Sequence, residues 1–164
     1  MRIIGIDPGL SGGIAILEDN KVKEIFDMPV MADGKKNKRQ LNSAFLVQLI
    51  KENIKDTEDT VMVVEQVNAM PGQGVTSMFN FGQTFGAIKG ICAALGLPIF
   101  FVRPAKWKKH FELINSSKDA SRTKAIEMYP SIAEKLSKKK DVNKSDAILI
   151  ARYYSETRYK EEKK

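Results

Sequence analysis

Three carboxylates in this sequence stand at the ends of segments that are otherwise apolar. Asp7 follows the run Ile3–Ile6, and Glu65 follows Val61–Val64, which has the β-branched composition of a central strand. Asp146 lies near the start of an expected helix with an apolar inner face. A buried and unpaired charge is costly, so each carboxylate needs a hydrogen-bond network, a cation or a metal as its partner.

The chemistry of these carboxylates depends on whether they meet. If strand 60–65 lies beside strand 2–7, Asp7 and Glu65 come close together and repel each other unless a positive charge separates them. A divalent cation with oxygen ligands meets that need. Taken singly, each has an ordinary structural explanation, such as helix capping or the helix dipole for Asp146. Taken together, they indicate a metal site for phosphodiester chemistry.

The distribution of charge favours a polyanionic partner. The chain has 27 basic and 20 acidic residues, a formal net charge of +7. Its bases cluster in four segments, at 34–40, 103–110, 118–124 and 135–144. Nucleic acid is the commonest partner of such a surface, although solvated loops and helix faces can carry the same charge.

Other features of composition exclude several classes of protein. The single cysteine, Cys92, lies in an apolar stretch, and we expect it in the core. One cysteine excludes an internal disulfide and a cysteine-based zinc cluster. We find no basic-then-apolar leader and no run of eighteen apolar residues, so we expect no export signal and no membrane span. These features favour a cytoplasmic protein.

The elements that position the carboxylates follow from the apolar pattern. Short strand-like runs with turn residues between them predict an antiparallel meander, and the later alternation of helices and strands predicts an α/β fold with a mixed five-stranded sheet. We predict one domain over 1–158, a frayed tail at 159–164, and polar or basic loops at 28–39 and after 102. The expected strands are 2–7, 13–18, 21–28, 60–67 and 97–102, and the expected helices are 41–55, 77–95, 119–129 and 143–157.

In their order and spacing, the segments "IGIDPGLSGGIAIL", "VVEQV" and "NKSDAILIA" resemble the RuvC-type Holliday junction resolvases of the RNase H-like (retroviral-integrase) superfamily. The resemblance extends from Met1 to about Tyr154, and the small size suggests a phage-type member. It implies an RNase H-like fold and a homodimeric endonuclease that requires Mg²⁺ or Mn²⁺, uses no nucleotide cofactor and acts on four-way DNA junctions. It also implies that Asp7, Glu65 and Asp146 hold two metal ions per active site.

One departure from the family concerns the metal ligands. Three residues before Asp146 the family has an acidic residue or a histidine, and this chain has Asn143. An amide oxygen can ligate a hard cation, but it adds no charge and cannot act as a base. Asp141 lies about 140° around the helix from Asp146 and substitutes only if the helix begins later. We therefore expect weaker metal binding and a preference for Mn²⁺.

A second departure concerns DNA. Family members carry an aromatic wedge after the "EQV" segment, where this chain has "NAM", so we expect Met70 or Phe79 to take its place. Trp107 either stacks on a base or packs in the core, and we favour the core. Lys108 also counts as a catalytic candidate, because the resemblance places supporting bases there. The residues expected to contact DNA phosphates are Lys108, Lys109, Lys118, Arg122 and Lys124.

Gly82, Gly86 and Gly90 recur every four residues in the expected helix 77–95. Each costs about 1 kcal/mol of helix propensity, so the close approach of another backbone must offset that cost. The other backbone belongs either to the chain's own sheet or to a partner subunit. The resemblance favours a homodimer, whose two-fold symmetry suits a four-way junction.

Three other functions stay open. Asn143 is compatible with a catalytically weak or inactive protein that binds junction DNA. The segment "DPGLSGG" also resembles the phosphate loop of actin-like kinases, but those need a second ATP-binding half that this chain lacks. The same fold and carboxylates also suit an RNase H-like nuclease acting on another nucleic-acid substrate.

Overall fold

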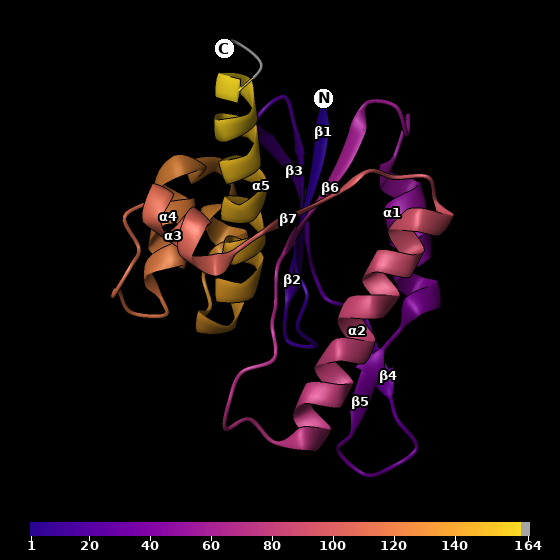
Figure 1. The fold of residues 1–164 in the computed structure, drawn as a ribbon. Helices are drawn as coiled ribbons and strands as arrows, with labels where there is room; N and C mark the ends of the chain where they lie inside the picture. The colour runs from indigo at the N-terminus through magenta and orange to yellow at the C-terminus, as the bar shows by residue number, and fades with distance from the viewer. Residues whose placement is uncertain (162–164) are drawn as a thin grey trace.

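The structure is a computed structural model that describes the backbone of residues 1–161 and the side chains of residues 1–158. Its centre is a mixed sheet with helices on both faces (Figure 1). The strands are β1 (Arg2–Asp7), β2 (Gly13–Glu18), β3 (Lys21–Asp27), β4 (Val30–Ala32), β5 (Arg39–Leu41), β6 (Thr60–Glu65) and β7 (Ile99–Val102). The helices are α1 (Ser43–Asn53), α2 (Val75–Ala94), α3 (Pro104–His110), α4 (Ala120–Met128) and α5 (Val142–Glu161), with 3-10 turns η1 (Pro130–Leu136) and η2 (Lys139–Asp141).

The predicted five-stranded mixed sheet is confirmed. The strand order is β3-β2-β1-β6-β7, with β1, β2 and β3 antiparallel and β1, β6 and β7 parallel. The register pairs Ile6 with Val64, so the next residues, Asp7 and Glu65, lie at the C-terminal ends of adjacent parallel strands. We call this end of the sheet the carboxylate edge; it lies at the lower end of β1 in Figure 1.

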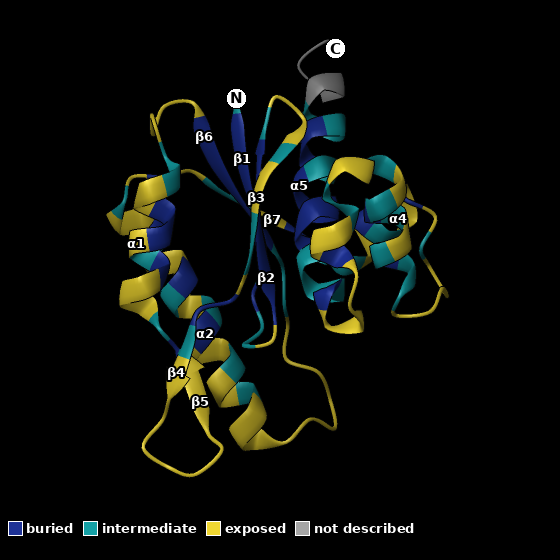
Figure 2. Ribbon diagram, turned by 180° about the vertical axis from the view of Figure 1, so that it is seen from behind, coloured by how far each residue is buried: buried dark blue, intermediate teal, exposed yellow. Residues whose placement is uncertain are grey.

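The central strands are buried on both faces, as their nearly continuous apolar sequences predict. Successive side chains of a strand point to opposite faces, so Ile3 and Val63 enter one core while Ile4 and Met62 enter the other. The first core is covered by α3, α4 and α5, and the second by α1 and α2 (Figure 2). Cys92, predicted to be a core residue, is buried in the second. The two cores fix the ends of β1 and β6.

Two glycines let α5 lie directly on the sheet. A Cβ at Gly5 would come within 2.2 Å of the Ala147 carbonyl oxygen, and a Cβ at Gly13 would come within 2.8 Å of the Lys144 Cα. A larger residue at either position would push the helix away. Because Asp146 lies between these two contact points on α5, the close packing brings it beside the carboxylate edge.

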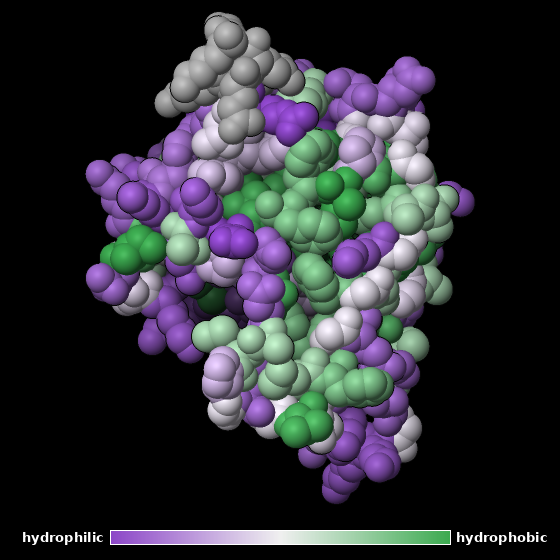
Figure 3. Space-filling view, in the orientation of Figure 1, coloured by the Kyte–Doolittle hydropathy of each residue, from purple (hydrophilic) through white to green (hydrophobic). Residues whose placement is uncertain are grey.

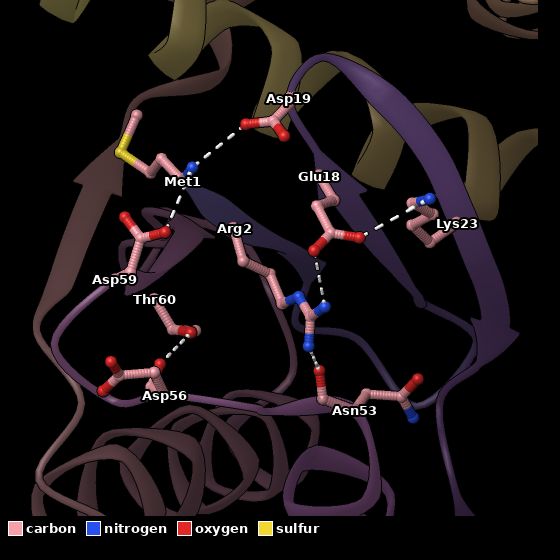
Figure 4. A network of polar contacts seen from close by, with 9 residues as sticks. All are labelled: Met1, Arg2, Glu18, Asp19, Lys23, Asn53, Asp56, Asp59 and Thr60. Carbon is pink, nitrogen blue, oxygen red and sulfur yellow. Dashed lines mark hydrogen bonds and ion pairs between the residues drawn. The ribbon is translucent and has the colours of Figure 1, made fainter.

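A polar network closes the opposite edge of the sheet (Figure 4). The buried guanidinium of Arg2 lies 3.0 Å from a carboxylate oxygen of Glu18 and donates to the Asn53 carbonyl oxygen, which ties β1 to β2 and to the end of α1. The N-terminal ammonium lies 3.1 Å from Asp19 and 3.2 Å from Asp59. At this edge of the sheet, the carboxylates of Glu18, Asp19 and Asp59 are therefore paired with cationic groups of the chain itself.

Two segments predicted as loops are ordered elements instead. Within 28–39, β4 pairs with β5 to form a hairpin, and α3 begins at Pro104 in the segment after β7. Both predictions were wrong because these elements are short and lie in or beside strongly basic stretches. The helix α5 extends to Glu161, and the rest of the predicted tail, 162–164, lies outside the described residues. Within 1–161, no helix combines the length and apolarity needed to cross a bilayer.

Candidate active site

The structure brings Asp7, Glu65 and Asp146 together although they are far apart in the sequence. Asp7 and Glu65 end adjacent parallel strands, and Asp146 comes from the helix packed on β1. All three side chains are partly buried. The charges of Glu65 and Asp146 both raise the pKa of Asp7, so the three groups are close enough to act on one another.

Burial and mutual repulsion disfavour the charged forms of these carboxylates. Burial, reinforced by the charges of Glu65 and Asp146, raises the pKa of Asp7 to about 7. The Gly9 backbone N–H, at 3.5 Å from Asp7, opposes this rise weakly. Burial also raises the pKa of Asp146 to about 6 and raises the pKa of Glu65. A cation bound among them would relieve both the desolvation and the repulsion.

Trp107 holds Glu65 in place. Its indole Nε1–H donates to the Glu65 carboxylate at 2.7 Å, which lowers the Glu65 pKa against the larger effect of burial. The Trp107 side chain is 1% exposed and packs in the core beneath α5, which confirms its prediction as a core residue. Its polar contact was missed; the available signal was that a buried indole N–H usually finds an acceptor.

Lys108 adds a positive charge beside the carboxylates. Its charge lowers the pKa of Asp7, of Glu65 and of Asp146. The Lys108 Nζ lies 5.5 Å from the centre of the Trp107 ring, within the range of a cation–π contact. Lys108 therefore lies where its ammonium can meet an anionic group that approaches the three carboxylates.

The chemistry of this donor set fits a hard divalent cation. Mg²⁺ and Mn²⁺ favour carboxylate oxygens. Among the residues whose side chains are described, no three Asp, Glu, His or Cys groups lie close enough together to hold a metal ion by themselves. Mg²⁺ usually keeps several waters and binds substrate phosphate as well, so an open set of carboxylates that supplies part of its coordination remains suitable.

Asn143 and Asp141 have structural contacts of their own. The Asn143 side-chain amide donates to the carbonyl oxygen of Ser11, in the loop that joins β1 to β2. The Asp141 carboxylate accepts from the Lys138 backbone N–H at 2.8 Å and lies 2.9 Å from the Lys144 ammonium. Asp141 thus stabilises the start of α5 and does not take the place of the acidic residue for which this chain has Asn143.

A hollow of about 330 Å³ opens beside Asp146. It is bounded by α3, α4, α5 and the intervening segment, and Lys108, Lys118 and Ser121 line it. The buried Ser121 hydroxyl lies near enough to Asp146 to lower the pKa of its carboxyl group. No hydrogen bond of ordinary geometry joins the Ser121 oxygen to any of the described residues. The hollow leaves Asp146 reachable from solvent next to two lysines.

The other residues predicted to bind DNA differ in whether their side chains are exposed or already have partners within the chain. Lys109 is exposed on α3. The Arg122 guanidinium donates to both carboxylate oxygens of Asp119, at 2.8 and 2.9 Å, and to the Leu136 carbonyl oxygen at 3.0 Å. Arg122 is therefore already engaged within the chain. Lys124 lines a different hollow, between the end of α3 and α4, whose lining includes none of the three carboxylates.

Apolar side chains are exposed along α2 and in the loop before it. Met70 is 58% exposed in the loop that follows β6, and Phe79 is 67% exposed on α2. Figure 3 shows apolar surface on the side of the molecule where α2 lies. Both predicted wedge residues are therefore accessible, and the loop carrying Met70 begins at the carboxylate edge.

The glycine ridge, defined as Gly82, Gly86 and Gly90, faces away from the sheet. A Cβ at any of the three would meet no atom of the described residues within 4 Å, whereas Ile88 and Cys92 of the same helix are buried. The alternative in which these glycines let α2 approach its own sheet is therefore wrong.

Replacing Trp107 by Phe is expected to weaken Mn²⁺ binding at the three carboxylates about 10- to 100-fold, because a hydrogen bond to a charged group contributes about 1.5–3 kcal/mol. Phe keeps most of the ring but leaves Glu65 without its indole donor. The Glu65 pKa then rises further, so the pH below which the cation is lost is expected to move higher, since metal ligands must be deprotonated. Calorimetric Mn²⁺ titrations over a pH series measure this shift.

A double-mutant cycle separates this contact from a general packing effect. In a Glu65→Gln background, Trp107→Phe is expected to change calorimetric Mn²⁺ binding little, because its acceptor has lost its charge. Equal changes in both backgrounds would contradict the role assigned to the contact. Trp107 is also the single tryptophan of the chain, so its emission is expected to change when a cation is added that binds at Glu65.

Comparisons with known proteins concern the fold. No protein-family model matches the sequence, and no curated protein matches it. RuvC of Thermus thermophilus, in complex with a Holliday junction substrate, is similar with a TM-score of 0.65 and 15% identity over 96% of both chains. The fowlpox virus Holliday junction resolvase is similar with a TM-score of 0.58 and 17% identity, over 96% of this chain and 99% of that chain. The chain therefore has the RuvC-type, RNase H-like fold that the sequence resemblance predicted.

Proposed function

We propose that this chain is a metal-dependent endonuclease that hydrolyses phosphodiester bonds in branched DNA, four-way junctions above all. The observation that carries the proposal is the cluster of Asp7, Glu65 and Asp146, whose pKa values are raised mainly by burial and are lowered only in part by the charge of Lys108. The cluster lies on a fold shared with resolvases whose structures contain Holliday junction DNA.

In this proposal Asp7, Glu65 and Asp146 hold two Mg²⁺ or Mn²⁺ ions, with the Asn143 amide oxygen as a further candidate ligand. Such ions, when bound, activate the attacking water and stabilise the leaving oxygen. The donors fit because they are oxygen ligands whose charge the chain leaves partly uncompensated.

The chain's own residues position the substrate. The buried strands β1 and β6 fix two carboxylates, and Trp107 orients the one on Glu65. Lys108 contacts an oxygen of the scissile phosphate, and Lys109 and Lys118 contact neighbouring phosphates without reading the sequence. Met70 or Phe79 enters the branch point, where unstacked bases offer apolar surface.

We further propose that the protein acts as a homodimer through α2. The exposed glycine ridge supports this interface, since it faces away from the chain's own core. A two-fold symmetric dimer presents two carboxylate edges, which suits a junction in which two strands must be cut.

The test is cleavage of labelled four-way, three-way and linear DNA in Mg²⁺ and in Mn²⁺. Metal-dependent cutting that favours the four-way junction supports the proposal, and better cutting in Mn²⁺ supports a weakened site at Asn143. Tight junction binding without cutting in either metal would instead support an inactive junction-binding protein. Preferential cutting of RNA or of an RNA–DNA hybrid would assign the fold to another substrate.

A further inference from the structure

The basic segment at 34–40 has no part in the function as proposed so far. It forms the tip and second strand of the β4–β5 hairpin, and we call residues 30–41 the basic hairpin. Lys35, Lys36, Lys38 and Arg39 are all exposed. Among the residues that the structure describes, none of these four makes an ion pair with a carboxylate, in contrast to Lys144, which lies 2.9 Å from a carboxylate oxygen of Asp141.

The basic hairpin is an ordered element with a structured tip. The Asp33 N–H donates to the Lys38 carbonyl oxygen at 3.0 Å, and the Lys38 N–H donates to the Lys35 carbonyl oxygen at 3.1 Å. Gly34 and Asn37 supply the positive φ angles, 59° and 65°, that the turn requires. The tip therefore presents three lysines from a fixed backbone, which lowers the entropy lost when they bind an anion.

The base of the basic hairpin is joined to the carboxylate edge. The Arg39 guanidinium donates to the Ser11 hydroxyl at 3.3 Å, and Ser11 belongs to the loop that leaves Asp7. The Ser11 carbonyl oxygen accepts from Asn143. The loop after Asp7 therefore contacts the basic hairpin on one side and α5 on the other.

The basic hairpin and the lysines of α3 lie on opposite sides of the sheet. Figures 1 and 2 show the β4–β5 hairpin on the side of α2, and α3 and α4 on the side of α5, with the lower end of β1 between them. Lys108 of α3 thus lies beside the carboxylates on one side, and the exposed Lys35, Lys36 and Lys38 belong to the hairpin on the other. A polar hollow of about 320 Å³ separates the basic hairpin from α2.

We propose that the basic hairpin is a second DNA-binding element, which grips backbone phosphates of the duplex arm that leaves the active site on the α2 side. This inference rests on the proposed function, because it takes the ligand to be the same branched DNA. Its physical basis is uncompensated charge held beside the carboxylate edge, opposite the lysines of α3. The contacts are to phosphates, so they add affinity and orientation without sequence preference.

The experiment measures how junction binding depends on salt, in protein carrying Asp7→Asn so that no cutting occurs. The hairpin variant combines Lys35→Ala, Lys36→Ala and Lys38→Ala. Each phosphate contact removed reduces the slope of log K against log salt by about 0.9, so the slope is expected to fall in magnitude by about 2 to 3. A variant with Arg at the same three positions is expected to keep the parent slope.

A matched control removes the same charge from the opposite edge. The far-edge variant combines Lys21→Ala, Lys51→Ala and Lys55→Ala, at the start of β3, in the last turn of α1 and beside the N-terminus. It is expected to keep the parent slope to within about one contact, that is about 0.9. Thermal unfolding of every variant checks that the fold is retained.

The outcomes separate this inference from the proposed function. If the Asp7→Asn protein binds junctions and the unaltered protein cuts them, but the hairpin variant keeps the parent slope, the basic hairpin inference is wrong and the nuclease stands. An equal loss of slope in the hairpin and far-edge variants would also overturn it. If the chain neither binds nor cuts any branched DNA, the proposed function and this inference fall together.

Discussion

Asp7→Asn is expected to abolish metal-dependent cleavage and, at the same time, to stabilise the metal-free protein. Asn keeps the shape of the side chain but removes the charge that the two proposed ions need. Loss of a central ligand is expected to reduce cleavage by about 10³-fold or more, which corresponds to about 4 kcal/mol of transition-state stabilisation. A residue that serves only the fold would behave differently, because its loss would lower both activity and stability.

The gain in stability follows from the raised pKa of Asp7. In the unfolded chain the group ionises near its ordinary pKa of 3.8, whereas in the folded chain it ionises at about 7. Its contribution to stability is therefore fully present below about pH 4 and is lost as the pH rises through about 7. Asp146, with its pKa raised to about 6, acts with the same sign over a narrower window. At pH 8 without metal, both carboxylates are charged at a free-energy cost.

The measurement is thermal unfolding at pH 5 and pH 8 in chelator, repeated with Mg²⁺ or Mn²⁺. The unaltered protein is expected to lose stability between pH 5 and pH 8 and to regain it with metal. Asp7→Asn is expected to be more stable at pH 8 by about 2–4 kcal/mol, roughly 4–16 °C in Tm for a chain of this size. Glu52→Gln, which neutralises an exposed carboxylate on α1, is expected to change neither stability nor cleavage. Cleavage by the Asp7→Asn protein, or a Tm at pH 8 below that of the unaltered protein, would contradict the metal role of Asp7.

The meeting of Asp7 and Glu65 could be predicted because it depends on strands. Apolar runs that end in a carboxylate place it at a strand end, and parallel neighbours bring such ends to one side of the sheet. The contact between Trp107 and Glu65 could not be predicted in the same way. The two residues are 42 positions apart, and their approach depends on α3, a short helix inside a segment that looks like a basic loop.

The basic hairpin also could not be predicted from the sequence. Its strands are only three residues long and mostly exposed. The sequence of β4 (Val30–Ala32) is apolar and that of β5 (Arg39–Leu41) is mostly polar, so the two strands share no pattern long enough to mark a hairpin. The glycine ridge was a different case, because its four-residue spacing identified one face of α2 but not what lies against that face. The burial of Ile88 and Cys92 on the other side of the helix shows that the glycine ridge faces away from the sheet.

Gly86→Glu is expected to break the proposed dimer while leaving the monomer at least as stable. A Cβ at Gly86 meets no described atom within 4 Å, so the monomer has room for the side chain. Replacing Gly in the middle of a helix also gains about 0.5–1 kcal/mol of helix propensity. At a dimer interface the same glutamate would be an unpaired buried charge that costs about 3–5 kcal/mol, so association is expected to weaken by about 10²- to 10³-fold or more.

Sedimentation and junction cleavage together test this expectation. At a concentration where the unaltered protein is a dimer, Gly86→Glu is expected to sediment as a monomer, with a Tm no lower than that of the unaltered protein. It is expected to nick junctions singly instead of cutting two strands in a symmetric pair, because each monomer carries one carboxylate edge. Ala44→Glu adds the same charge to an exposed position on α1 and is expected to leave dimerisation and paired cutting unchanged. A Gly86→Glu protein that stays dimeric would place the interface elsewhere, and the exposed apolar surface of α2 would then be free to contact the branch point of the DNA.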